Sequence, residues 1–291
     1  MTQIIASLAS VAGRYEALFC DLWGCVHNGV TPFPSAVAAL RAYRAGGGRV
    51  VLMTNAPRPS PSVIRQLDRM GMPRDAWDIV VSSGDASRAA MIQGAVGTRV
   101  YHLGPEKDES FFTETEDGLD ASHVERVPLD EAEGVVCTGL FDDRVETPED
   151  YRPTLLFAKT RGLKLLCTNP DIVVDMGDER VFCAGAIAQL YEEMGGEAIY
   201  CGKPHPPIYD LARRRLAEIG PPPGDAVLCV GDGVLTDVKG GMGEGLDTLF
   251  ITGGLAAREF GPDPLVPDAA LLERWLASHR LSATYAMAAL R

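Results

Sequence analysis

Short apolar runs alternate with amphipathic stretches along almost the whole chain of 291 residues, and this alternation most restricts what the chain can fold into. Apolar runs of strand length that are separated by about 10–15 helical residues are typical of βαβ units in a parallel sheet. We predict strands at residues 17–20, 50–54, 79–82, 99–103, 134–138, 164–167, 198–201, 227–230 and 248–251. We predict helices at residues 35–45, 60–70, 85–93, 148–161, 185–194, 206–219 and 237–241. The pattern indicates an α/β fold built on a parallel sheet.

The middle of the chain differs in character from the two ends. Residues 104–127 are acidic and loop-like, and the alternating pattern resumes at Gly134. We therefore expect a second domain inserted at residues 97–197, between core segments at residues 1–96 and 198–291.

The charge balance restricts the partners of the chain. It has 27 Lys and Arg against 40 Asp and Glu, which gives a formal net charge of −13. Such a field repels nucleic acid phosphates and acidic lipids, so we expect neither nucleic acid nor a membrane as a partner. It equally repels a phosphorylated metabolite, so a phosphate site would need local cations, most simply a metal ion.

Cysteine usage and hydropathy indicate a compartment. The seven cysteines are scattered and form no CxxC pair, which favours a reducing cytoplasm. No apolar stretch approaches the ~20 residues of a membrane span, and the first residues lack the basic region and cleavage site of a signal peptide. We expect a soluble cytoplasmic protein.

Polar side chains follow several of the expected strands, at the point where each strand ends. In chain order these residues are Asp21, Thr54 with Asn55, Lys203, and Asp232 with Asp237. Taken singly, each is most simply a turn residue, a helix cap or a solvated cation. The carboxyl ends of parallel strands line one edge of a sheet, however, so residues far apart in sequence can meet there. Their order predicts a shared site.

These four pieces resemble the four motifs of the haloacid dehalogenase superfamily of phosphohydrolases. The insertion resembles the C2-type cap of its class IIA subgroup, which includes pyridoxal and nitrophenyl phosphatases. Thr168-Asn169-Pro170-Asp171, the turn Cys183-Ala184-Gly185-Ala186 and Gly202-Lys203-Pro204 also resemble that subgroup. The resemblance implies a Rossmann-like three-layer core with a parallel sheet, plus an inserted α/β cap domain.

The resemblance also implies a chemistry. A carboxylate that attacks phosphorus splits ester hydrolysis into two easier steps through an acyl phosphate, and Asp21 is the expected nucleophile. Because two anions repel each other, a divalent metal is needed, and Mg²⁺ is the expected cofactor. Asp21 and Asp232 would supply carboxylate ligands, and the Trp23 backbone carbonyl a third. Asp237 would anchor the metal site from outside.

The expected phosphate and substrate contacts come from the remaining motifs. Thr54 and the Asn55 amide would bind phosphoryl oxygens, and Lys203 would offset negative charge during the transfer. The cap would exclude water and set the substrate, with Asn169, Asp171, Asp175 and the 183–186 turn as specificity positions. Those cap residues are equally well interpreted as ordinary polar residues of surface loops.

One position departs from the family pattern. Most members carry a second aspartate two residues after the nucleophile, as general acid and base, where this chain has Trp23. Tryptophan can perform neither proton transfer, and that transfer is typically worth ~10²–10⁴-fold. Esters with good leaving groups should suffer least. His27 is a candidate replacement, although a packing or substrate-contact role is the simpler interpretation.

Three hypotheses follow. The first is a Mg²⁺-dependent phosphatase that acts on a small phosphorylated metabolite through an aspartyl-phosphate. The second is a catalytically impaired protein on the same fold that binds a phosphometabolite or another protein. The third keeps the nucleophile for phosphotransfer, or for carbon–halogen or carbon–phosphorus cleavage. The sequence leaves a homodimer as a possible assembly. The amphipathic stretch at residues 271–290 is expected to pack on the core and close it.

Overall fold

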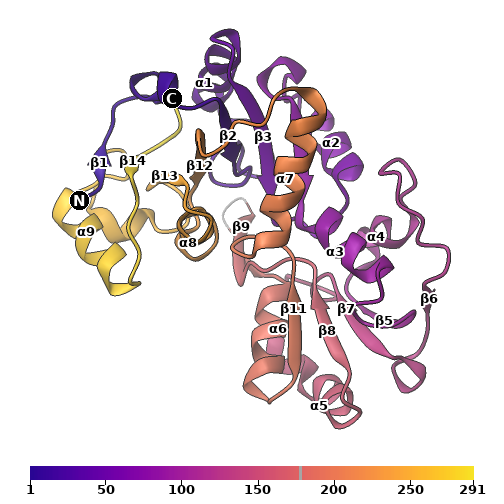
Figure 1. The fold of residues 1–291 in the computed structure, drawn as a ribbon. Helices are drawn as coiled ribbons and strands as arrows, with labels where there is room; N and C mark the ends of the chain where they lie inside the picture. Colours follow the sequence, from indigo (N-terminus) through magenta and orange to yellow (C-terminus); the bar gives the residue numbers. More distant parts are fainter. Residues whose placement is uncertain (177–178) are drawn as a thin grey trace. The chain divides into compact units, whose positions relative to one another are not determined.

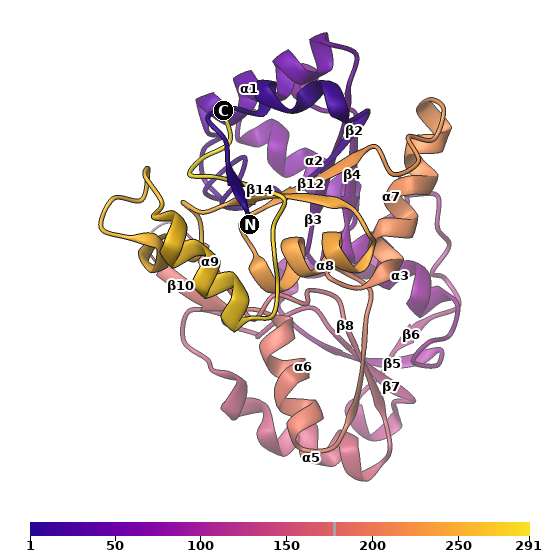
Figure 2. The same cartoon turned by 60° about the vertical axis from the view of Figure 1, so that its left-hand side comes forward.

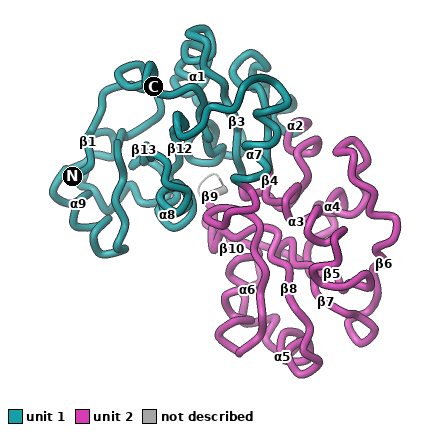
Figure 3. The backbone as a smooth tube through the Cα atoms, in the orientation of Figure 1, with its two compact units in different colours: residues 1–54, 66–81, 209–291 teal, residues 55–65, 82–208 magenta. Residues whose placement is uncertain are grey.

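The computed structural model describes residues 1–176 and 179–291 (Figure 1). Figure 3 shows two compact units, each made of segments that are distant in sequence. The first unit comprises residues 1–54, 66–81 and 209–291, and the second comprises residues 55–65 and 82–208. None of the described helices is both long enough and apolar enough to cross a membrane.

The first unit is built on a seven-stranded sheet with the order β1-β14-β13-β12-β2-β3-β4. Every neighbouring pair from β1 to β3 is parallel. The strands are β1 (Gln3–Ile4), β2 (Ala17–Cys20), β3 (Arg49–Thr54), β4 (Ile79–Ser82), β12 (Val227–Gly231), β13 (Asp247–Ile251) and β14 (Tyr285–Met287). All residues of the central strands β2 and β12 are buried, because a parallel sheet is covered on both faces.

Helices cover this sheet, as the two views of Figures 1 and 2 show. They are α1 (Pro34–Ala45), α7 (Pro206–Ile219), α8 (Lys239–Gly243) and α9 (Ala269–Ser278). Helix α2 (Ser60–Arg69) begins in the second unit and ends in the first. Helix α9 packs on β13 through Leu272 and Leu276, and its Trp275 ring stacks on Phe250 with the ring centroids 5.9 Å apart. The stretch at residues 271–290 therefore lies against the core and ends in a strand of its sheet.

The second unit holds a five-stranded parallel sheet with the order β11-β8-β7-β5-β6. Its strands are β5 (Arg99–Leu103), β6 (Glu125–Arg126), β7 (Gly134–Cys137), β8 (Lys164–Cys167) and β11 (Glu197–Tyr200). Its helices are α3 (Ser83–Ile92), α4 (Ser110–Thr113), α5 (Arg152–Thr160) and α6 (Ala184–Glu193). Strands β9 (Val173–Met176) and β10 (Glu179–Phe182) pair antiparallel in a separate sheet.

The α/β class with a parallel-sheet core and an α/β cap is confirmed. All nine expected strands are present, and the short strands β1, β6, β9, β10 and β14 were not predicted. The helix expected at 237–241 corresponds to α8 at Lys239–Gly243, and a separate π-helical turn at Val234–Val238 precedes it. The boundaries of the two compact units differ from residues 97 and 197. The limits expected for the inserted domain stay a prediction.

Candidate active site

Two buried aspartates follow neighbouring strands of the first unit. Asp21 comes directly after β2, and Asp232 directly after β12, the strand paired with β2. The Asp21 N–H donates to the Val230 carbonyl at 2.8 Å, which extends the sheet hydrogen bonding to the nucleophile candidate. Asp21 is 9% exposed and Asp232 5%. Ligand atoms of Asp21, Asp232 and Cys25 all lie within 4.8 Å of one another.

Glycines let the backbone approach the Asp232 carboxylate closely. A Cβ atom at Gly24 would lie 2.1 Å from Asp232 Oδ2, and one at Gly254 would lie 1.9 Å from the same atom. Gly24 also has a φ of +72°, which side chains rarely adopt. The Leu255 N–H donates to Asp232 Oδ2 at 2.9 Å. The loop after β13 therefore fixes the orientation of this carboxylate.

Asp237 organises the loop that carries Asp232. Its side chain lies in the π-helical turn, and the Gly233 N–H donates to Asp237 Oδ2 at 3.1 Å. A Cβ at Gly231 would lie 2.0 Å from Asp237 Cγ, so the two segments touch. Asp237 is outside the Asp21–Cys25–Asp232 group found among the described residues. This geometry suits a residue that positions the loop rather than a direct ligand.

Thr54 ends β3, the strand on the other side of β2. Its side chain is buried. Because β12, β2 and β3 are adjacent and parallel, Asp232, Asp21 and Thr54 follow one another along the same edge of the sheet.

Trp23 packs on the turn that follows Asp21. Its ring lies edge-on to the His27 ring, with the centroids 5.4 Å apart, and a Cβ at Gly29 would lie 2.4 Å from it. The His27 ring is 2% exposed, and its Nδ1 accepts a hydrogen bond from the Gly29 N–H at 3.0 Å. Burial lowers the pKa of His27 to about 4. The imidazole is therefore neutral at pH 7, with its proton on Nε2.

In the second unit, Asn55 joins three segments that are far apart in sequence. Its Nδ2 donates to Asp171 Oδ1 at 2.9 Å and to the Lys203 carbonyl at 3.1 Å. The Lys203 N–H donates back to Asn55 Oδ1 at 2.8 Å. Asn169 Oδ1 accepts from the Asp171 N–H at 3.1 Å, and Lys203 is buried. The structure thus groups four of the expected phosphate and substrate residues.

The remaining expected cap residues have local partners. Asp175 pairs with Arg180 across the β9–β10 ladder, with Oδ1 and Nε 2.7 Å apart. Cys183 precedes α6, and its N–H donates to the Ile172 carbonyl at 2.9 Å. A Cβ at Gly185 would lie 2.3 Å from the Pro170 carbonyl oxygen, so the 183–186 turn lies against the Asn169–Asp171 segment.

Comparison with known proteins shows the family of this chain. A family model described as haloacid dehalogenase-like hydrolase matches residues 18–116, and a model described as HAD-hydrolase-like matches residues 200–272. A haloacid dehalogenase-like family hydrolase from Brucella suis 1330 is 42% identical, and the match covers 99% of this chain and 100% of the other. Its crystal structure superposes with a TM-score of 0.86. The chain belongs to the haloacid dehalogenase-like hydrolase family.

Two curated relatives of this hydrolase carry more specific names. A 5'-nucleotidase of Bacillus subtilis (strain 168) is 23% identical over 252 residues, which are 86% of this chain and 92% of the relative. The D-glycerol 3-phosphate phosphatase of Mycobacterium tuberculosis is 26% identical over 251 residues, 85% of this chain and 66% of the relative. A glycerol phosphate phosphatase of the same organism in complex with magnesium shares the fold. It is 24% identical, with a TM-score of 0.63, over 87% of this chain and 74% of that chain.

The expected superfamily and the expected enzyme class, a hydrolase of the haloacid dehalogenase type, are confirmed. Two parts of the hydrolase's site were not predicted. Cys25 was not selected as a site residue, although it follows Asp21 closely within the same motif. Gly254 and Leu255 were not selected, although they follow β13 in a glycine-rich turn.

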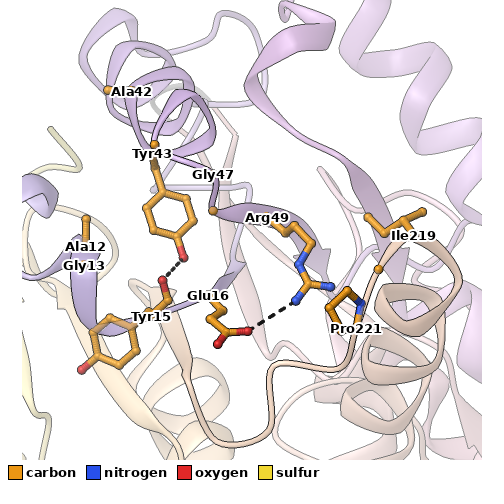
Figure 4. A pocket seen from close by; sticks show the side chains of 13 residues that line it. Ala12, Gly13, Tyr15, Glu16, Ala42, Tyr43, Gly47, Arg49, Ile219 and Pro221 are labelled. Carbon is orange, nitrogen blue, oxygen red and sulfur yellow. Dashed lines mark hydrogen bonds and ion pairs between the residues drawn. The ribbon is translucent and has the colours of Figure 1, made fainter.

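The hydrolase also has a cavity of about 640 Å³ at the opposite end of the strands (Figure 4). Tyr15 and Glu16 precede β2 there, and Arg49 begins β3. Arg49 forms an ion pair with Glu16 at 3.9 Å, and the Tyr43 hydroxyl donates to the Tyr15 carbonyl at 2.9 Å. None of the expected site residues lines this cavity.

Proposed function

We propose that this haloacid dehalogenase-like hydrolase is a Mg²⁺-dependent phosphatase of small phosphorylated metabolites. The observation that carries the proposal is the buried pair Asp21 and Asp232 at the carboxyl ends of neighbouring strands. The names of the relatives, a nucleotidase and a glycerol phosphate phosphatase, support a small phosphate ester as the substrate class.

The donor set fits a divalent cation. Two buried carboxylates within 4.8 Å repel each other, and a cation between them offsets this repulsion. Asp21, Asp232 and the Trp23 carbonyl would hold Mg²⁺, which prefers one or two carboxylates with further oxygen ligands. When bound, Mg²⁺ neutralises negative charge on the carboxylates and the phosphate.

Asp21 is the nucleophile in this proposal. One of its carboxylate oxygens forms a bond to phosphorus, and the ester P–O bond breaks with its electron pair leaving on the alcohol oxygen. Water then attacks the aspartyl-phosphate, which releases inorganic phosphate and restores the carboxylate. Thr54, buried at the end of β3, would donate its hydroxyl to a phosphoryl oxygen. The contacts assigned to Asn55, Asn169, Asp171 and Lys203 stay predictions.

The leaving group should decide the rate. The indole N–H of Trp23 is far too weakly acidic to protonate the leaving oxygen. The Nδ1 atom of the neutral His27 accepts a hydrogen bond from the Gly29 N–H. We therefore expect aryl and acyl phosphates, whose leaving oxygens need no proton, to be hydrolysed faster than alkyl phosphates. A catalytic role for His27 stays a prediction.

Phosphate release from aryl, acyl and alkyl phosphates, with Mg²⁺ and with EDTA, tests the proposal. We expect Mg²⁺-dependent turnover that Asp21→Asn abolishes, because the amide cannot form the acyl phosphate. Circular dichroism should show that the variant is folded. Residual metal-dependent turnover in Asp21→Asn would remove Asp21 as the nucleophile.

The Trp23 ring favours a second candidate, a protein that binds a phosphometabolite without hydrolysing it. The ring packs on His27 and Gly29 at the position where most family members carry the general acid. Tight calorimetric binding of a phosphate ester, with no phosphate released from any ester of the panel, would favour this candidate over the phosphatase.

A further inference from the structure

The Cys25 thiol faces the two carboxylates of the candidate metal centre. Gly24 turns the chain with a φ of +72°, and the N–H groups of Val26 and His27 both donate to the Leu22 carbonyl. This tight turn returns the chain toward Asp21. Cys25 Sγ lies within 4.8 Å of carboxylate oxygens of both Asp21 and Asp232.

Among residues 1–176 and 179–291, no polar group forms a hydrogen bond with the Cys25 thiol. Cys25 is 1% exposed, and the described part of the chain offers it no hydrogen bond. The thiol of Cys20 differs, because it donates to the Asp21 carbonyl at 3.3 Å. This buried sulfur atom has no hydrogen-bond partner among the described residues and lies close to two carboxylates. That is the arrangement expected of a metal ligand.

The three donors differ in their preference for metals. Carboxylate oxygens suit hard cations such as Mg²⁺, whereas a thiolate favours softer cations such as Zn²⁺ and Co²⁺. A centre with two carboxylates and one thiol therefore has a mixed character that two carboxylates alone lack.

We propose that Cys25 supplies a sulfur ligand at this centre, so that the protein binds Zn²⁺ and Co²⁺ there through Asp21, Cys25 and Asp232. The inference rests on the metal centre of the proposed function and adds a ligand to it. On binding, the thiol proton passes to water and the sulfur–metal bond forms. Zinc–ligand distances are about 2.0–2.3 Å, so small side-chain rotations draw the three atoms together.

Titration of the full-length protein with Co²⁺ tests the inference without any turnover. A thiolate ligand gives a sulfur-to-cobalt charge-transfer band in the near ultraviolet, which carboxylate ligands alone do not give. We expect this band in the wild type and its loss in Cys25→Ser. The matched control is Cys229→Ser, a buried strand thiol that packs on Gly241 instead and should keep the band.

Calorimetry supplies a second measurement. Cys25→Ser should lower the affinity for Zn²⁺ by at least about tenfold. A loss of that size follows even when only a hydrogen-bond partner of a metal ligand is removed. It should leave the affinity for Mg²⁺ unchanged, because Mg²⁺ is held by oxygen atoms. Equal losses for both ions would show a general distortion of the site and would overturn the inference.

Three outcomes of the cobalt titration would also overturn it: no Co²⁺ binding, binding without the band, and a band that persists in Cys25→Ser. The proposed function fails separately. Mg²⁺-dependent phosphate release without a cobalt–sulfur band leaves the phosphatase standing and removes the sulfur ligand. A cobalt–sulfur band without phosphate release from any ester supports the sulfur ligand and removes the phosphatase.

Discussion

Replacing Gly254 with alanine should misplace the Asp232 carboxylate. The new Cβ would lie 1.9 Å from Asp232 Oδ2 and 2.5 Å from both Cβ and Cγ of that residue. Ordinary contacts begin at 3.4 Å, so the carboxylate would have to move by about 1.5 Å. The clash reaches Asp232 Cβ, so rotation of the carboxylate group alone cannot relieve it. The hydrogen bond from the Leu255 N–H to Oδ2 would also be lost.

A misplacement of about 1 Å at a reacting centre can cost 10²-fold in rate. We therefore expect Gly254→Ala to lower kcat/KM for an aryl phosphate by about 10²-fold or more, and to weaken Mg²⁺ binding, because Asp232 would hold the ion. Phosphate release at several Mg²⁺ concentrations measures both effects.

Gly243→Ala provides the matched control. Gly243 ends α8 in the same unit, and nothing lies within 4 Å of a Cβ placed there. This control should keep the wild-type kcat/KM and Mg²⁺ dependence. A Gly254→Ala enzyme with wild-type activity and wild-type Tm would refute the assignment of the Asp232 carboxylate to the catalytic centre.

Three further results are expected. Trp23→Asp should raise kcat/KM for alkyl phosphates by about 10²-fold or more but change aryl phosphates little, since it supplies a general acid; equal gains for both classes would contradict the leaving-group argument. Arg88→Met should cost about 3–5 kcal/mol in urea unfolding, because the Arg88–Asp117 pair is 1% exposed at both side chains. The ion pair of Lys164 is exposed, so Lys164→Met is the control and should lower the free energy of unfolding by only about 0–1 kcal/mol. A similar loss of stability in both variants would refute the argument. Burial lowers the pKa of His102 from 6.5 to about 4, so the unfolded chain binds more protons between these values and stability falls as the pH drops through them. His102→Gln should flatten this dependence by about 1–2 kcal/mol after solvent screening, as thermal unfolding at pH 4–7 would measure; an unchanged slope would exclude His102 as its source.

The main strands follow from the sequence because a buried parallel strand is a continuous apolar run. Strands β2, β4 and β8 have the predicted limits. The strands β9, β10 and β14 carry no such run of useful length. β14 has three residues, and it becomes a strand because β1 and β13 flank it.

The site residues divide in the same way. Asp21 and Asp232 were selected because each follows a predicted strand, and Thr54 because it ends one. Cys25 was missed because a cysteine beside apolar residues is usually a core residue. Only the turn that Gly24 allows brings its thiol to the two carboxylates.

The sequence by itself determined the α/β class and the polar residues at the strand ends, because both depend on local periodicity. The tertiary structure alone decided that β12 lies beside β2, and this pairing puts Asp232 next to Asp21. Strand order depends on hydrogen bonds and side-chain packing between segments far apart in the chain, and no local pattern specifies such partners. The same is true of Asn55, which meets Asp171 and Lys203 only in the folded second unit.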